Sequence, residues 1–222
     1  MTKDVWAVVP VKRFADAKRR LAPVLGTHAR GELARVMFED VLDALMRCGG
    51  ALAGTIVVTA DPDAAEIGRR CGATVLFEDE ERGINGAVRS AVARLEPGAG
   101  IVIVPSDIPH LSPSAIAMAA DAISAPQTLA IAAAKDGGTN LLACRPASAV
   151  PLHFGMDSYR AHMRAGGQSG LAMSVLRVPE LTLDIDTPED LDAFRLLRTE
   201  TRTHAFLSNA PVNGDLAREG AL

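Results

Sequence analysis

Acidic residues follow two apolar segments of this 222-residue chain, and basic residues follow a third. Asp107 comes two residues after the end of the apolar run Ile101–Pro105, and Asp184 and Asp186 lie in the later segment LTLDIDTPEDLDAF. The first apolar run, VWAVVP, leads straight into the cationic stretch VKRFADAKRRLAP. Carboxylates bind Mg²⁺ together with phosphate oxygens, and lysines neutralise phosphate charge. The combination predicts a site for a metal-bound polyphosphate and points to nucleotidyl transfer.

Lys12 and Lys18 are the candidate phosphate-binding residues of the cationic stretch, with Pro10 at its start. The alternative is that this stretch is an ordinary solvated basic loop. The position of the stretch directly after a first parallel strand favours phosphate binding. The chain has no G-x-x-x-x-G-K-[ST] and no G-x-G-x-x-G motif. A P-loop is therefore excluded and a dinucleotide-binding Rossmann site is disfavoured.

Asp107 and Asp186 are the candidate metal ligands. Asp184 and Asp186 are two residues apart, so on a strand their side chains share a face, and Asp186 is better placed to reach a ligand. The alternative for Asp107 is a turn residue ahead of a capped helix. The neighbouring Thr187, together with Glu189 and Asp190, is interpreted as helix capping only.

Three further segments have both a functional and a structural interpretation. The stretch GINGAVRSA, with Gly83 and Asn85, could open a helix whose free N–H groups face a ligand. The alternative is a loop in which glycine is needed only for the backbone conformation. The stretch KDGGTN is most simply a hairpin turn. The stretch HFGMDSY offers Gly155 and Ser158 for an anion nest, or a plain helix cap. The five histidines show no metal-ligand spacing and are expected to be structural or exposed.

Apolar periodicity and turn residues indicate the elements that must position these side chains. Short apolar runs alternate with helical patterns, which predicts a three-layer α/β/α fold with a mostly parallel sheet and ligands at the carboxyl ends of the strands. The polar stretch 11–26 is expected to be a loop, and 203–222 a disordered tail after a single domain spanning 1–202. Strands are expected at 5–9, 55–59, 73–77, 101–105, 129–134, 141–144, 175–179 and 181–185, and helices at 27–48, 62–72, 84–95, 113–124, within 153–167, and at 188–198.

The composition limits the classes of partner. Aromatic residues make up 4% of the chain and the net charge is −4, so nucleic acid is not an expected partner. No apolar run reaches the ~18 residues of a membrane span. The three cysteines are dispersed, which is typical of a reduced compartment. The sequence begins with an expected strand and shows no signal-peptide pattern, so we expect a cytoplasmic protein. The oligomeric state is left open, with a homodimer as one alternative.

The chain resembles the CofC/FbiD-type guanylyltransferases of coenzyme F-420 biosynthesis. The resemblance covers roughly residues 5–198 and is carried by six motifs in order. One departure is VPSDIP, where many relatives have an A-D-L-P type loop. The motifs are VPVKRFADAKRRLAP, GINGAVRSA, VPSDIPHL, KDGGTNLL, FGMDSY and LDIDTPEDL.

The resemblance implies a GT-A-like nucleotidyltransferase fold, as in nucleotide-diphospho-sugar transferases, and transfer of GMP from GTP to a three-carbon phospho-acid with release of pyrophosphate. The acid would be 2-phospho-L-lactate, phosphoenolpyruvate or 3-phospho-D-glycerate. By motif, Mg²⁺ would be held by Asp107 and Asp186. The resemblance also implies that Lys12 and Lys18 contact the triphosphate and, with Asp107, take part in catalysis. Gly83 and Asn85 would lie near the guanosine. The acceptor would be bound by Thr139, Gly155 and Ser158.

Three alternatives remain at this level, and the weakest is a flavodoxin-like binding module, which would lack a use for two distant strand-end aspartates. A molybdopterin or sugar-phosphate nucleotidyltransferase of the same fold usually opens with a glycine-rich loop, and this chain has no glycine between Val5 and Leu25. An inactive nucleotide-binding scaffold would be expected to lose Asp107 or Asp186, and both are present.

Overall fold

A seven-stranded mixed sheet forms the centre of the protein. The computed structural model describes residues 4–209, and within them the strand order is β3-β2-β1-β4-β6-β5-β7. Strands β3, β2, β1 and β4 run parallel, β6 is antiparallel to both β4 and β5, and β7 is parallel to β5. The expected mostly parallel α/β sheet is confirmed. The strands are β1 Val5–Val11, β2 Gly54–Thr59, β3 Thr74–Phe77, β4 Gly100–Ile103, β5 Thr128–Ala133, β6 Thr139–Arg145 and β7 Ala172–Val175.

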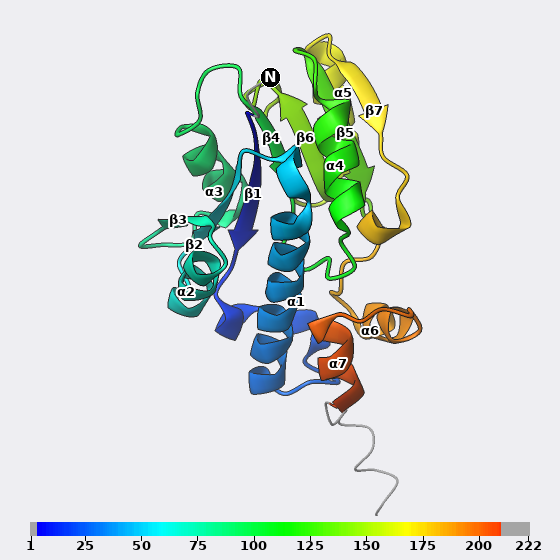
Figure 1. The fold of residues 1–222 in the computed structure, drawn as a ribbon. Helices are drawn as coiled ribbons and strands as arrows, with labels where there is room; N and C mark the ends of the chain where they lie inside the picture. The colour runs from blue at the N-terminus through cyan, green and yellow to red at the C-terminus, as the bar shows by residue number, and fades with distance from the viewer. Residues whose placement is uncertain (1–3, 210–222) are drawn as a thin grey trace, which may run out of the picture.

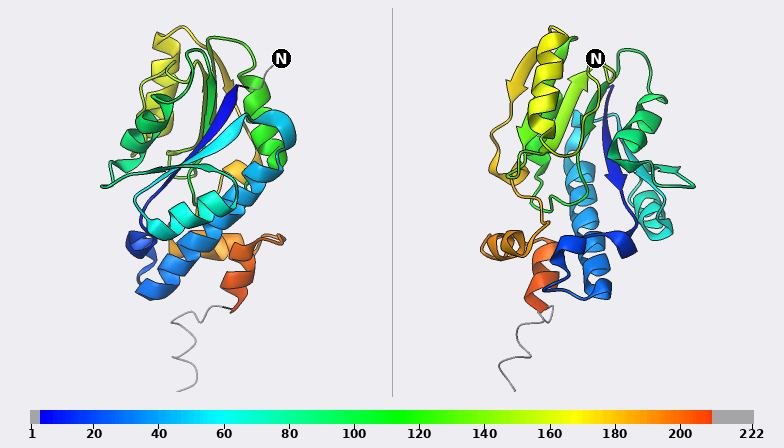
Figure 2. Two further views of the ribbon diagram at one scale, coloured as in Figure 1. Left: turned by 60° about the vertical axis from the view of Figure 1, so that its left-hand side comes forward. Right: turned by 180° about the vertical axis from the view of Figure 1, so that it is seen from behind.

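Helices cover both faces of this sheet (Figures 1 and 2). One buried apolar cluster joins β1 and β4 to helices α1, α2 and α4, and a second joins the other sheet face to α3 and α5. These two clusters complete the three layers. The helices are α1 Thr27–Arg47, α2 Pro62–Arg70, α3 Gly83–Val92, α4 Pro113–Ala122, α5 Ser158–Gln168, α6 Pro188–Arg195 and α7 Arg202–Asn209, with short 3₁₀ turns at Phe14–Asp16, Arg19–Leu21, Gly49–Ala51 and Pro179–Leu181. None of the helices within residues 4–209 combines the length and apolar character of a membrane span.

The predicted helix starts are confirmed by their caps. Asp61 accepts N–H bonds from the first turn of α2, Ser112 does the same for α4, and each is followed by proline at the first helical position. At α6, Thr187 and Asp190 form a reciprocal capping box. These signals act within four residues of sequence, which is why they could be recognised without the structure.

The two strands expected at 175–179 and 181–185 are not found there. The last strand is β7, three residues earlier at Ala172–Val175, and residues 182–187 form no strand. Leu181 and Ile185 are nevertheless fully buried, and the Ile185 N–H donates to the Asp107 carbonyl at 3.2 Å. The burial of these two residues thus arises from a non-strand segment that packs on the apolar clusters, without a ladder partner. Asp186 therefore lies in a loop and not at a strand end.

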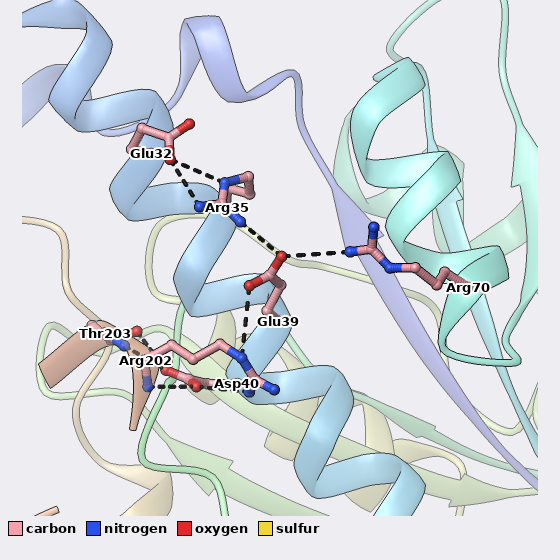
Figure 3. Close-up of polar contacts among 7 residues, drawn as sticks. All are labelled: Glu32, Arg35, Glu39, Asp40, Arg70, Arg202 and Thr203. Atoms are coloured by element: carbon pink, nitrogen blue, oxygen red, sulfur yellow. Dashed lines mark hydrogen bonds and ion pairs between the residues drawn. The ribbon is translucent and has the colours of Figure 1, made fainter. Parts of the chain in front are cut away.

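The C-terminal segment forms a docked helix where disorder was expected. The structure shows α7 at Arg202–Asn209, so the prediction of a disordered tail from residue 203 is wrong for 203–209, and 210–222 lie outside the described residues. The buried carboxylate of Asp40 on α1 accepts the backbone N–H groups of Arg202 and Thr203 at 2.9 and 2.8 Å, and the Thr203 hydroxyl at 2.7 Å (Figure 3).

An ion-pair network surrounds this docking point on α1 (Figure 3). Arg35 pairs with Glu32 and Glu39, and Glu39 also lies 3.8 Å from Arg202 and 3.9 Å from Arg70 of α2. Mostly solvent-accessible pairs of this kind contribute little individually. Among the polar contacts, the buried Asp40 bonds therefore contribute most to the attachment of α7.

A third apolar cluster lies at the carboxyl end of the sheet. It joins the loop after β1 to the start of α1, the segment around Ile185, and helices α6 and α7. In Figures 1 and 2 these parts lie together beyond the end of β1. The cluster therefore holds the basic loop next to the segment that bears Asp186. Its buried members are Leu21, Leu25, Leu33, Val36, Met37, Ile185, Leu191, Phe194 and Leu207.

Candidate active site

Lys18, Asp107 and Asp186 meet at the carboxyl end of the sheet. The Lys18 Nζ lies 2.6 Å from Asp107 Oδ2 and 2.7 Å from Asp186 Oδ1. The lysine side chain is 6% exposed, and those of Asp107 and Asp186 are 27% and 38% exposed. The two predicted metal ligands, far apart in sequence, are therefore close enough to share one cation.

The loop that carries Lys18 is fixed by backbone bonds to neighbouring elements. The Phe14 N–H donates to Asp61 Oδ2 at 2.8 Å, and the Arg13 N–H donates to Glu81 Oε1 at 2.6 Å. Lys18 itself has φ 53° and ψ 40°, a left-handed conformation that non-glycine residues seldom adopt. The 3₁₀ turn that follows buries Leu21 completely. The stretch 11–26 is thus an ordered structure with two 3₁₀ turns.

The charges within the cluster shift its pKa values. Burial alone would lower the pKa of Lys18, but the charges of Asp107 and Asp186 outweigh it and raise that pKa. Burial alone would raise the pKa of Asp186, but Lys18, with Arg20 and Lys12 further away, lowers it. Lys18 is therefore an ammonium and Asp186 a carboxylate near neutral pH.

Asp184 lies in the same neighbourhood but in a different environment. Its burial, together with the charge of Asp107, raises its pKa to about 6, although Asn140 Nδ2 donates to its Oδ1 at 3.2 Å. Burial is the larger of these two causes, because it disfavours the charged form of a carboxyl group. Asp184 therefore holds its proton more readily than Asp186, whose pKa is lowered by Lys18.

A cleft of about 650 Å³ opens beside the cluster. This volume lies within the usual range for a small-molecule site. The cleft brings the basic loop, the start of α3 and the carboxylates onto one surface. Among the residues that line it are Pro10, Lys12, Lys18, Arg20, Gly83, Asp107 and Asp186.

Asn85 is placed differently from the prediction. It does not line the cleft, and its side chain is bonded to the backbone of Phe154: Nδ2 donates to the carbonyl and Oδ1 accepts the N–H, both at 2.9 Å. With both polar ends used, Asn85 joins α3 to the segment before α5. Its place beside a nucleotide stays a prediction, and Gly83 lines the cleft.

Thr139 and Ser158 are brought together, at a distance from the cleft lining. The Ser158 Oγ donates to Thr139 Oγ1 at 3.0 Å, and both residues are buried. Gly155 has φ 137°, and a Cβ built there would meet no atom within 4 Å, so the space beside it is open. These three predicted acceptor residues form one small group, separate from the surface that Lys12 and Gly83 line.

Comparison with protein families identifies the chain. Residues 5–219 match the family described as "Guanylyl transferase CofC like". The chain belongs to this family. The resemblance inferred from the six sequence motifs is confirmed.

Individual relatives support the same assignment over nearly the whole chain. A phosphoenolpyruvate guanylyltransferase of Conexibacter woesei is 38% identical, covering 95% of this chain and 96% of the relative. A 2-phospho-L-lactate guanylyltransferase of Methanothermobacter thermautotrophicus is 36% identical, covering 90% and 88%. A 3-phospho-D-glycerate guanylyltransferase of Phenylobacterium zucineum is 34% identical, covering 83% and 86%.

Solved structures show the same fold. A putative nucleotide-diphospho-sugar transferase from Desulfovibrio desulfuricans superimposes with a TM-score of 0.76 at 21% identity, covering 98% of each chain. A nucleotidyl transferase from Methanothermobacter thermautotrophicus gives 0.64 at 19% identity, covering 93% of this chain and 99% of that one. The nucleotidyltransferase fold predicted from the sequence is thereby confirmed.

Some residues of the site were not singled out from the sequence. Asp61 was recognised as a helix cap, but not as the residue that also holds the basic loop. Asn140, which contacts Asp184, follows the expected hairpin turn and carries no motif of its own. His162 was expected to be structural or exposed. It is buried, and its Nδ1 lies 3.1 Å from Thr139 Oγ1. Helical spacing after Ser158 was the available signal, since residues four apart share a helix face.

Proposed function

We propose that this protein is a guanylyltransferase that transfers GMP from GTP to the phosphate of a small phosphorylated acid and releases pyrophosphate, in coenzyme F-420 biosynthesis in the cytoplasm. The acid is 2-phospho-L-lactate, phosphoenolpyruvate or 3-phospho-D-glycerate, the acceptors named for its relatives. The observation that carries the proposal is the meeting of Lys18 with Asp107 and Asp186 at the mouth of a cleft lined by further cationic residues.

The residues present fit a Mg²⁺ ion in this role. Within residues 4–209 no three acidic, histidine or cysteine side chains form a ready-made metal cage. Mg²⁺ usually takes one or two carboxylates and completes its shell with waters and substrate phosphates, so Asp107 and Asp186 are sufficient. The Lys18 ammonium already marks the place between them as a cation position. When bound, the metal would offset charge on the triphosphate and orient it.

The chain's own groups account for the remaining chemistry. Lys12, Lys18 and Arg20 line the cleft, and we assign them to the triphosphate. An oxygen of the acceptor phosphate attacks the α-phosphorus, a new P–O bond forms, and the bond to the β-phosphate oxygen breaks. A phosphate monoester is largely a dianion at neutral pH because its second pKa is ~6. No general base is needed, and positioning with charge neutralisation supplies the catalysis.

The test is a panel with purified protein, GTP, MgCl₂ and each of the three acids, read out by pyrophosphate release and by the guanosine-containing product. Transfer to at least one acid, with GTP preferred over ATP, CTP and UTP, is expected. An Asp107→Asn variant, prepared in parallel, is the control for contaminating activity. Transfer only to a sugar phosphate or to molybdopterin, or to none of these acceptors, would contradict the proposal.

A further inference from the structure

A buried chain of hydrogen bonds ends at Thr139. The His153 backbone N–H donates to His162 Nε2 at 2.9 Å, and His162 Nδ1 lies 3.1 Å from Thr139 Oγ1. The Ser158 Oγ donates to the same Thr139 oxygen at 3.0 Å. His162 is fully buried, with Phe154 packed edge-on against its ring. The chain joins the start of α5 to the first residue of β6.

The protonation of His162 follows from its partners. A backbone N–H can only donate, so Nε2 must be the unprotonated nitrogen of the ring. A neutral ring then carries its hydrogen on Nδ1, which must donate to Thr139 Oγ1. Burial and the nearby His153 lower the pKa of His162 to about 4, so the ring is neutral near pH 7.

The hydroxyl oxygen of Thr139 therefore cannot accept a further hydrogen bond. Its oxygen accepts hydrogen bonds from His162 and from Ser158, which occupies both lone pairs. Among residues 4–209 no group accepts the hydrogen of this hydroxyl. If the Ser158–Thr139 bond ran the other way, the spare hydrogen would belong to Ser158. In either direction the pair retains one hydroxyl hydrogen for a further acceptor.

We propose that His162 is a positioning residue for the acceptor substrate: it fixes the Thr139–Ser158 pair as a hydrogen-bond donor to an anionic oxygen of the phospho-acid. This inference rests on the proposed function. A hydroxyl that could also accept would be indifferent to an anion, whereas one that can only donate favours a phosphate or carboxylate oxygen.

The surroundings of the pair suit a small anion. The space beside Gly155, three residues before Ser158, is open, and the positive φ there lets the backbone turn without a side chain. Asn140, the next residue along β6, contacts Asp184. Because neighbouring residues on a strand point to opposite faces, β6 presents the donor pair on one face and the carboxylate neighbourhood on the other. Thr139 is the first residue of β6, which runs antiparallel to β4, so an acid bound beside it lies at the same end of the sheet as Asp107.

The experiment compares His162→Phe with His162→Asn in steady-state kinetics, varying GTP and the preferred acid separately. Phe keeps a ring of similar size without an N–H, and we expect the KM of the acid to rise on the order of 10-fold, with the KM of GTP within about twofold of wild type. Asn offers an amide N–H near the Nδ1 position, and we expect it to restore most of the acid affinity. His153→Asn keeps the backbone N–H and serves as the matched control, with both KM values unchanged.

A second measurement is independent of turnover. Long-range ¹H–¹⁵N correlation of the His162 ring in the wild-type protein should show the neutral form with the hydrogen on Nδ1 at pH 7. A hydrogen on Nε2, or equal changes of both KM values in His162→Phe, would overturn the inference while leaving guanylyl transfer intact. Absence of transfer by the wild type to all three acids would instead overturn the proposed function, and the inference with it.

Discussion

Replacing Lys18 by Met tests whether this lysine and a divalent cation occupy the same place. Met retains an unbranched apolar stem and the left-handed backbone strain, so the main change is the loss of the ammonium between Asp107 and Asp186. Removing one partner of a fully buried ion pair costs about 3–5 kcal/mol, because the remaining charge is left unbalanced. Here the lysine is buried, but both carboxylates remain partly exposed to water.

Two effects reduce the cost in this site. Water screens the carboxylates, and the variant no longer has to bury an ammonium. We therefore expect the free energy of unfolding to fall by about 1–2 kcal/mol in metal-free buffer at pH 7. For a domain of this size that corresponds to a decrease in Tm of roughly 3–6 °C.

Added divalent metal should stabilise the Lys18→Met variant more than it stabilises the wild type. In the wild type a cation must displace the Lys18 ammonium from the carboxylates, whereas in Lys18→Met it meets them directly. Binding to the folded state stabilises it by about 2.7 kcal/mol at a hundredfold excess over Kd, so tighter binding gives a larger Tm shift. We expect MgCl₂ or MnCl₂ without nucleotide to raise the Tm of the variant more than that of the wild type.

The assay is thermal unfolding followed by circular dichroism, with and without divalent metal, and with KCl at matched ionic strength. Lys12→Met is the control, because Lys12 lines the same cleft but forms no ion pair within the described residues. Its response to metal should match that of the wild type. Equal metal-induced shifts in wild type and Lys18→Met, or none in the variant, would refute the reasoning that the lysine and the metal share one position.

Three further changes test other parts of the structure. Asp107→Asn should lower the turnover of pyrophosphate release on the order of 10²-fold or more with unchanged circular dichroism, since one preorganised electrostatic contact is lost; turnover near wild type would contradict the assignment. Asp40→Ala removes the buried acceptor of four hydrogen bonds from α7 and should lower the free energy of unfolding in urea by about 2–3 kcal/mol. Asp43→Ala, which breaks an exposed pair on the same helix, should change it by less than about 0.5 kcal/mol. The pKa of His162 is lowered to about 4, so the unfolded chain binds the extra proton first as pH falls, and the contribution of His162 to stability should fall by roughly 3 kcal/mol between pH 6.5 and 4. Asp184, whose pKa is raised to about 6, changes stability in the opposite direction, so urea titrations should show the His162 effect as the difference between wild type and His162→Asn.

The parts of the fold that sequence reasoning predicted depend on local signals. The caps at Asp61 and Ser112 and the box at Thr187–Asp190 each act within a few residues, and the hairpin of β5 and β6 is marked by its glycine turn. Helix α7 shows the opposite case. Its first N–H groups are satisfied by Asp40, more than 160 positions earlier in the chain, so its own small and polar sequence gave no indication of order.

The candidate site divides in the same way. Asp107 and Asp186 could be found because carboxylates after apolar runs are conspicuous, and their meeting follows from the topology. The pairing of Lys18 with both could not be predicted, because it requires a left-handed residue held by turns on either side. The bond between the Asn85 amide and the backbone of Phe154 could not be predicted either, because it is a contact across 69 residues. His162 was expected to be structural or exposed and is buried, but its contact with Thr139 could not be predicted because Thr139 lies on another element.

The third apolar cluster explains how such a lysine conformation is kept. A left-handed non-glycine residue costs about 1–2 kcal/mol, and it persists where surrounding contacts determine the backbone. Leu21 and Leu25 follow Lys18 and are buried against the segment around Ile185, directly before Asp186. Leu207 of α7 closes the same cluster. The packing that anchors the C-terminal helix therefore also fixes the distance between Lys18 and Asp186. A variant that releases α7, such as Asp40→Ala, should accordingly reduce guanylyl transfer although it lies outside the cleft.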